Sequence, residues 1–296
     1  MSEPNSSPIS SRRLDSAIAD RPSVTGMGLR LSSATQRNFL QQQWDRTLAL
    51  VAQVGQITEM TLGTLRAMFR RPFEVRSILQ QIEALGVASV GIVTVTSVFI
   101  GMVMAVQFAF GLRKFGGMEY TGRVIGLTFS RELAPTFTAV IVGGRIGAGM
   151  AAEVGSMAVT EQIDAVRALG ADPLKKLVLP RLMASIIVMP LLASFALVLG
   201  FAGAMMVTDW EFKIPAQFFL RSALGSVTMS DFMSGLFKTP FFGAIIALVG
   251  CHFGLTTRGG TAGVGNSTTR TVVVIAISIL IADLFLTKVA FRIFPF

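Results

Sequence analysis

Long apolar runs separated by short polar stretches dominate the chain from about residue 85 onward. A helix needs about 20 mainly apolar residues to cross a hydrocarbon core about 30 Å thick, and five runs meet that length. They cover approximately residues 85–112, 121–157, 177–207, 232–255 and 271–291. The pattern therefore predicts an all-α integral membrane protein with five transmembrane helices.

The stretch before the first run is amphipathic. Residues 44–82 alternate apolar and polar positions at helical spacing, and four arginines cluster near the end, at Arg66, Arg70, Arg71 and Arg76. This pattern is typical of a helix that lies in the headgroup plane of a membrane. An amphipathic helix packed against the rest of the protein is the alternative, and both can hold. Residues 1–43 are rich in Ser, Arg and Pro without an apolar core, which predicts a disordered basic cytoplasmic tail.

The second run carries charges, which are expensive within a membrane and usually face a partner or a cavity. They are Arg131, Glu132, Arg145 and Glu153. Arg131 and Glu132 either form ion pairs or hydrogen bonds that fix helix packing, or contact a lipid headgroup in a cavity. Adjacent residues on a helix point about 100° apart, so the two need not pair with each other. Glycines at 143 and 147 allow close helix packing or form a hinge.

Two segments between the apolar runs are polar or glycine-rich. Residues 160–170, TEQIDAVRALG, predict a short polar helix at the membrane surface that ends at Gly170 and serves as a docking element. Residues 256–270 are rich in glycine and threonine and predict a tight cytoplasmic connector. Five spans from a cytoplasmic amino terminus place the carboxyl terminus outside. The excess of basic residues on the predicted inner side supports this orientation.

Composition narrows the function. The chain is 52% hydrophobic and 15% charged, whereas soluble domains carry about a quarter charged residues. The net charge of +9 comes from basic residues that flank apolar runs and attract anionic lipids, so no nucleic-acid partner is expected. The sequence contains no P-loop, G-x-S-x-G or H-E-x-x-H motif, and a single histidine beside a single cysteine cannot build a metal site. We therefore expect no catalytic residue, no metal site and no cofactor in this chain.

Several motifs resemble the MlaE/YrbE permeases of lipid-transporting ABC systems. They are the run FIGMV from Phe99, RELAP at 131–135, GGRIGAGMAAEVGSM at 143–157, TEQIDAVRALGADPLKKLVLPR at 160–181 and GGTAGVGNSTTRTVV at 259–274. The resemblance covers nearly all of the chain from about residue 50 onward. Ala134 stands where other members have glycine in RELGP.

The resemblance implies a permease domain over residues 44–296. Its parts would be an interfacial helix, five transmembrane helices and a cytoplasmic coupling helix between the second and third spans. It implies a non-enzymatic, multi-pass subunit in the bacterial inner membrane. It also implies a homodimer that works with a separate ATP-binding ABC ATPase, a periplasmic MCE-domain protein and often a STAS-domain subunit. Such transporters move phospholipids or related lipids between inner and outer membranes and maintain outer-membrane lipid asymmetry.

Residue roles follow from the resemblance by position. The lipid-binding candidates are Met104, Leu112, Phe115, Arg131 and Glu132. The coupling helix would run from Thr160 to Gly170. Its ATPase-facing residues would be Glu161, Gln162, Asp164 and Arg167, while Ile163, Val166 and Leu169 would hold its other face.

Two other function classes are open to the sequence. An ion- or proton-coupled secondary transporter would use Arg131, Glu132, Arg145 and Glu153 as a relay. Such transporters usually show repeated halves or broken helices at corresponding positions, and no internal repeat is evident in this sequence. A membrane-embedded enzyme is disfavoured, because the nucleophile and metal motifs are missing.

Overall fold

The computed structural model describes residues 44, 48, 52–68 and 75–294, and the chain divides into two units, residues 1–56 and 57–296. The predicted disordered tail, residues 1–43, lies outside the described residues. Of the predicted interfacial segment, residues 52–68 are helical, and residues 69–74 lie outside the described part. A position of this helix in the headgroup plane stays a prediction.

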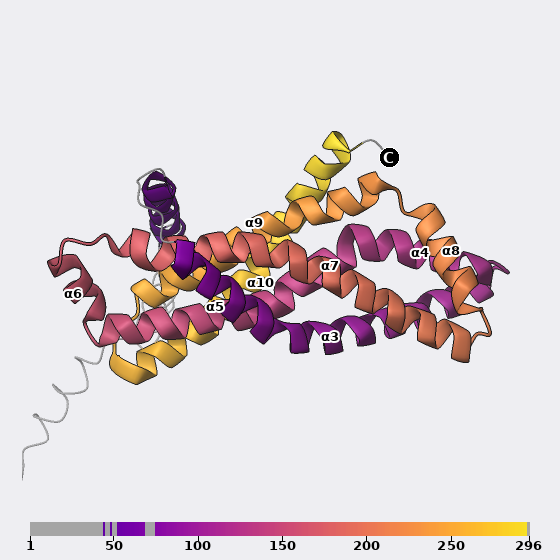
Figure 1. Cartoon of the computed structure of the whole chain (residues 1–296), viewed down its shortest axis with the longest axis horizontal. Coiled ribbons are helices and arrows are strands. Elements are labelled where there is room, and N and C mark those ends of the chain that lie inside the picture. The colour runs from indigo at the N-terminus through magenta and orange to yellow at the C-terminus, as the bar shows by residue number, and fades with distance from the viewer. Residues whose placement is uncertain (1–43, 45–47, 49–51, 69–74, 295–296) are drawn as a thin grey trace, which may run out of the picture. The chain divides into compact units, whose positions relative to one another are not determined.

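The second unit contains five helical segments long and apolar enough to cross a membrane. The first is α3 (Val75–Arg113). The second runs through η1 (Met118–Tyr120), α4 (Thr121–Thr128), η2 (Phe129–Leu133) and α5 (Ala134–Val159). The third joins η3 (Leu174–Val178) to α7 (Leu179–Trp210), and the last two are α9 (Met229–Leu255) and α10 (Gly260–Ile293). The short helices α6 (Gln162–Ala168) and α8 (Ala216–Ser226) connect spans. The predicted all-α fold with five spans is confirmed (Figure 1).

Two span boundaries differ from those predicted. Helix α3 begins at Val75, so residues 75–82 continue into the first span without a break, because no proline or glycine interrupts that stretch. Helix α10 begins at Gly260, so most of the predicted connector 256–270 is helical and that prediction was wrong. Gly259 makes the turn with a φ of 92°, a conformation that glycine adopts readily. The helix then tolerates further glycines, because each costs only about 1 kcal/mol.

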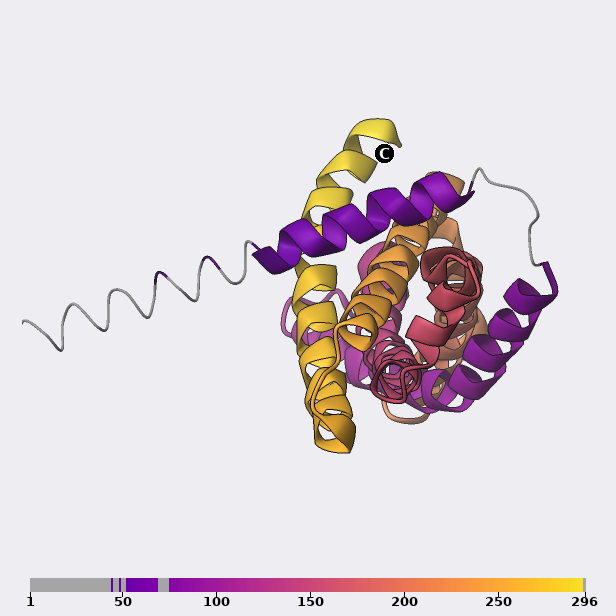
Figure 2. The ribbon, with the colours of Figure 1, turned by 90° about the vertical axis from the view of Figure 1, so that its left-hand side faces the viewer.

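Helices α5, α7 and α9 pack against one another at the centre of the unit. Helix α3 packs along α7, and α10 packs along α5 and α9, so α3 and α10 lie on opposite flanks (Figure 2). A Cβ atom at Gly101 of α3 would overlap the carbonyl oxygen of Gly200 of α7. Gly143 and Gly147 likewise make room for Ile246 of α9 and Ile275 of α10. The geometry therefore favours close packing over a hinge at the two α5 glycines.

The two ends of the helix bundle differ. Helix α6 lies at one end, and α4 and α8 pack together at the other (Figure 1). The turn between α9 and α10 lies at the α6 end, where Thr257 packs against Gly155 of α5. Both polar connections predicted to be cytoplasmic therefore lie on the same side.

Candidate functional site

The Arg131–Glu132 pair lies in η2, which is a π-helical turn inside the second span. Pro135 explains the wide turn: it has no N–H, and in an α-helix its ring would clash with the carbonyl of Arg131 four residues earlier. The N–H of Ala134 donates instead to the carbonyl of Phe129, five residues back. A Cβ atom at Gly235 would overlap the carbonyl oxygen of Ser130, so α9 runs directly against the turn. Single π turns occur frequently at functional sites.

Glu132 is bound by a buried lysine from α9. The Nζ of Lys238 donates to Oε2 of Glu132 at 2.6 Å, to Oδ1 of Asp283 at 3.1 Å and to Oγ1 of Thr287 at 2.8 Å. The Thr287 hydroxyl donates in turn to Oε1 of Glu132 at 3.2 Å. All three protons of the ammonium group are therefore used. The network joins three spans, since Asp283 and Thr287 lie on α10.

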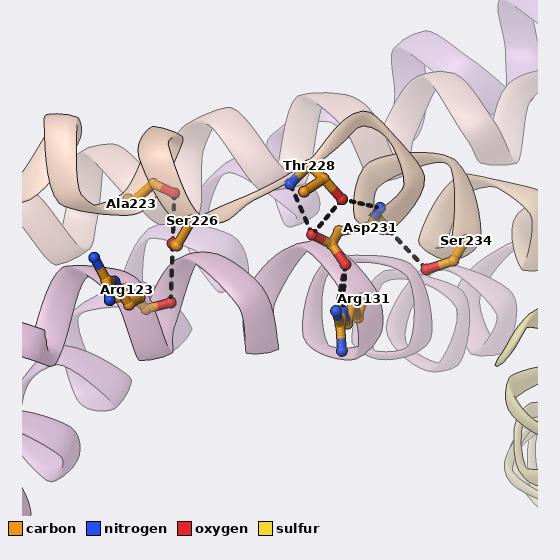
Figure 3. Close-up of polar contacts among 7 residues, drawn as sticks. All are labelled: Arg123, Arg131, Ala223, Ser226, Thr228, Asp231 and Ser234. Carbon is orange, nitrogen blue, oxygen red and sulfur yellow. Dashed lines mark hydrogen bonds and ion pairs between the residues drawn. The ribbon is translucent and has the colours of Figure 1, made fainter. Parts of the chain in front are cut away.

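Arg131 is bound by a different residue of α9. Its Nε donates to Oδ1 of Asp231 at 2.7 Å, and its Nη2 also pairs with that oxygen (Figure 3). Asp231 is held by a capping box at the start of α9, in which its Oδ2 accepts from the N–H and hydroxyl of Thr228 at 2.7 and 2.8 Å. The guanidinium of Arg131 also lies over the ring of Phe291 of α10, 5.9 Å from its centroid. Asp231 thus orients Arg131 and starts α9 at the same time.

These side chains form a charged cluster, which we define as Arg131, Glu132, Asp231, Lys238, Asp283 and Thr287. With every group ionised it holds two cations and three carboxylates. The Lys238 side chain is 1% exposed, whereas those of Arg131 and Glu132 are 27% and 36% exposed. Lys238 lies nine residues into α9, about 13 Å from its start. The cluster therefore has a buried centre well inside the span, and Arg131 and Glu132 form its most accessible edge.

The structure shows which residues the predicted pair, Arg131 and Glu132, binds. Arg131 and Glu132 do not pair with each other, as the helix geometry suggested, and each binds a partner on α9. The interhelical ion pairs support a packing role directly, and contact with a lipid stays a prediction. Sequence reasoning missed Asp231, Lys238, Asp283 and Thr287. Lys238 and Asp283 could have been found, because each is a charge within a predicted apolar run.

The remaining lipid-binding candidates come from the end of the first span. Met104 and Leu112 lie on α3 and are half-buried, and Phe115 is exposed in the turn that follows. All three precede α4 in the chain, Met104 nine residues before the end of α3 and Leu112 one residue before it. Their contact with a lipid stays a prediction.

The other two charges of the second span do not join the cluster. Arg145 donates to Oγ of Ser89 on α3 at 3.2 Å, and Glu153 pairs with Arg181 of α7 at 2.7 Å. Glu153 lies 21 residues after Glu132, about 30 Å along the helix axis. The four residues proposed for a proton or ion relay therefore do not lie together, and the structure gives no support to that alternative.

Helix α6 forms where the polar segment predicted one, within two residues at each end. Its ATPase-facing candidates, Glu161, Gln162, Asp164 and Arg167, are all exposed. Gly170 caps the helix as predicted, with a φ of 75°; the N–H of Gly170 donates to Arg167 and that of Ala171 to Val166, as in a Schellman motif.

The predicted anchoring face of α6 is only partly correct. Ile163 is buried against Val154 of α5 and Leu177 of η3, and Val166 is half-buried. Leu169 is 86% exposed, because the helix ends at Ala168 and the chain turns away there. Leu169 is therefore an accessible apolar side chain beside the charged residues of α6.

Comparison with known proteins identifies relatives across most of the chain. Residues 78–289 match the family described as Permease MlaE. A probable ABC transporter permease protein of Synechocystis is 37% identical over 262 residues, which are 88% of this chain and 97% of the relative. Protein TRIGALACTOSYLDIACYLGLYCEROL 1, chloroplastic, of Arabidopsis thaliana is 40% identical over 217 residues, 73% of this chain and 62% of the relative. A probable ABC transporter permease protein of Rickettsia bellii is 34% identical over 248 residues, 84% of this chain and 96% of the relative.

Proposed function

The chain belongs to the MlaE family of permeases, and from this membership we propose that it is the membrane-spanning subunit of an ABC transporter that moves phospholipids or related lipids. The family match over residues 78–289 is the observation that carries the proposal, and we assign the lipid headgroup to the charged cluster. The guanidinium group of Arg131, which is 27% exposed beside Asp231, suits a phosphate, and Glu132 can accept hydrogen bonds from hydroxyl or ammonium groups of a headgroup. Met104, Leu112 and Phe115 would contact the apolar part of the same lipid. The name of the Arabidopsis relative, which contains that of a galactolipid, supports a lipid as cargo.

ATP hydrolysis belongs to a separate ATPase subunit, since this chain lacks a P-loop. Helix α6 is the surface that would receive it. Ile163 fixes the helix to the bundle, while Asp164, Arg167 and Leu169 are exposed. An apolar side chain surrounded by charged ones has the composition of a protein interface, with an apolar centre and a polar rim.

The remaining parts of the proposal concern assembly and place. We assign the subunit to a homodimer in the bacterial inner membrane, together with a periplasmic MCE-domain protein and, in some systems, a STAS-domain subunit. The transporter moves lipid between the inner and outer membranes and maintains outer-membrane lipid asymmetry. We place the homodimer contact at α10, whose most apolar stretch has the smallest buried share among the five spans of the described chain. Its exposed side chains include Ile277, Leu280, Ile281, Leu284 and Phe285.

Purification and reconstitution test this function. A tagged chain isolated from its native membrane should bring down an ABC ATPase and an MCE-domain protein, and mass spectrometry should detect bound lipid. In proteoliposomes the complex should move labelled lipid only with ATP, and a complex with an inactivated ATPase is the control. Recovery of the chain without an ATPase, or ion flux without lipid movement, would contradict the proposal.

A further inference from the structure

Arg181 lies at the base of the segment that carries α6. It belongs to α7, one turn after η3, and its side chain is only 5% exposed. Its Nη2 pairs with Oε1 of Glu153 on α5 at 2.7 Å, and its Nη1 donates to the carbonyl of Leu177 in η3 at 2.8 Å. Its Nε has no hydrogen-bond partner among the described residues. Arg181 thus ties together the two helices between which α6 is inserted.

A second contact joins the same elements from the α6 side. Ile163 of α6 is buried together with Val154 of α5, next to Glu153, and with Leu177 of η3, whose carbonyl accepts from Arg181. The ion pair and the apolar cluster therefore close residues 153–181 into a loop, and α6 forms the exposed part of that loop. We call these contacts the α6 clasp, defined as Glu153, Ile163, Leu177 and Arg181.

The turn at the clasp resembles the turn at the charged cluster. Both η2 and η3 are π-helical turns of five residues, and in both a proline follows after one further residue, Pro135 and Pro180. Helix α5 connects the two regions directly. Its first residue, Ala134, follows the turn that holds Arg131 and Glu132, and Glu153 lies near its other end. Helix α5 is therefore a continuous connection between the clasp and the charged cluster.

We propose that Arg181 is a positioning residue that, through Glu153, makes α6 move as one body with α5 and α7. The proposal rests on the proposed function in one respect, namely that α6 receives the ATPase. The ion pair does not contact α6 itself but fixes α5 to α7 where the α6 segment leaves them. Without it, the apolar cluster around Ile163 would be the remaining part of the clasp that joins α6 to these two helices. A displacement of α6 by the ATPase would then change only the conformation of residues 153–181 and would not move α5 and α7. ATP would be hydrolysed without moving lipid.

Hydrogen–deuterium exchange of the purified permease tests the clasp without any partner. Glu153→Gln is the main variant, because Glu153 is 58% exposed and its replacement endangers folding least. Arg181→Met and Arg181→Lys complete the series. Arg145→Met is the matched control, since Arg145 also lies on α5 but bonds to α3.

Amides of α6 should exchange about tenfold faster in Glu153→Gln and Arg181→Met. This factor lies between the effect expected from removing an exposed ion pair and that expected from removing a buried one. Arg181→Lys should fall between these variants and the wild type. Unchanged exchange in Glu153→Gln would overturn the clasp.

The coupling ratio tests what the clasp does. In the reconstituted complex, lipid moved per ATP hydrolysed should fall by about threefold or more in Glu153→Gln, while the amount of bound ATPase stays at the wild-type level. The Glu153→Gln/Arg181→Met double variant should be no worse than Arg181→Met alone, because both changes remove the same contact. A wild-type ratio in Glu153→Gln, despite faster exchange, would overturn the positioning role. If the wild-type chain binds no ATPase, the proposed function fails, and the exchange result still decides the clasp.

Discussion

Replacing Lys238 with methionine removes the single cation of the Glu132–Lys238–Asp283 network and shortens the side chain by one heavy atom, the ammonium nitrogen itself. The variant leaves two carboxylate oxygens that had both bonded to the same nitrogen, at 2.6 and 3.1 Å. These oxygens can be at most about 6 Å apart, and two like charges at that distance repel by about 3 kcal/mol at an effective dielectric constant of about 20. Breaking a buried pair typically costs about 3–5 kcal/mol. Because Glu132 is 36% exposed and water screens its charge, we expect the lower limit, a loss of about 3 kcal/mol in the free energy of unfolding.

The same reasoning predicts a rescue. Adding Glu132→Gln and Asp283→Asn to Lys238→Met removes the two negative charges that Lys238→Met leaves without their cation, and uncompensated buried charge is the main cost of breaking such a pair. The triple variant should therefore recover most of the stability that Lys238→Met loses. Lys288→Met is the matched control, because Lys288 is exposed on α10, and surface changes usually stay within about 0.5 kcal/mol.

Stability can be followed as the fraction of monodisperse protein in detergent after heating, or by chemical unfolding in mixed micelles. The reasoning is refuted if Lys238→Met is as stable as Lys288→Met, or if the neutral triple variant is less stable than Lys238→Met alone. If the triple variant is stable and assembles but moves no lipid, the charges are needed for transport as well as for packing.

Three further predictions concern the ATPase surface of α6, the Arg131–Glu132 pair and the orientation of the chain in the membrane. Leu169→Asp should release the ATPase, since loss of a central apolar anchor costs about 2 kcal/mol or more, while the chain still inserts; unchanged co-purification would contradict the α6 interface. Arg131→Ala and Glu132→Ala should each impair lipid transport while the complex still assembles, and a photocrosslinker at position 132 should capture lipid. Loss of folded protein without a crosslink would assign the pair to packing alone. In a chain without its native cysteine, single cysteines at Thr261 and Phe115 should label from the cytoplasmic and the outer side, respectively; labelling of both from one side would contradict the span count.

Hydropathy predicted the number and order of the spans because each span must satisfy one strong physical condition. A helix in hydrocarbon satisfies its backbone hydrogen bonds internally and needs apolar side chains over its full length. The starts of the first and last spans were missed because that condition applies only within the membrane. Glu83 in α3 and the glycines after Gly260 in α10 are compatible with a helix that continues beyond the apolar core. Only the neighbouring elements decide where such a helix begins.

The charged cluster was predicted in part. Arg131 and Glu132 stand out in an apolar run, and Lys238 and Asp283 carry the same signal of a charge at membrane depth. Thr287 carries none, because threonine hydroxyls in helices commonly bond to the backbone of the preceding turn, as that of Thr271 does to the carbonyl of Ser267. Which charge meets which partner depends on how α5, α9 and α10 are rotated about their axes. A single sequence does not contain that information.

The π turn explains how two adjacent residues bind one helix at two separate points. Asp231 and Lys238 are seven residues apart on α9, so they lie on one face, about 10 Å apart along the axis. Arg131 and Glu132 differ by only about 1.5 Å in rise, yet Arg131 reaches Asp231 and Glu132 reaches Lys238. The long side chains diverge along α9 from the point where Gly235, midway between these partners, lies against the carbonyl of Ser130. Gly235 on α9 and the wide turn before Pro135 therefore bring the two backbones close together. At this distance the adjacent residues Arg131 and Glu132 can bind Asp231 and Lys238, one on each side of Gly235.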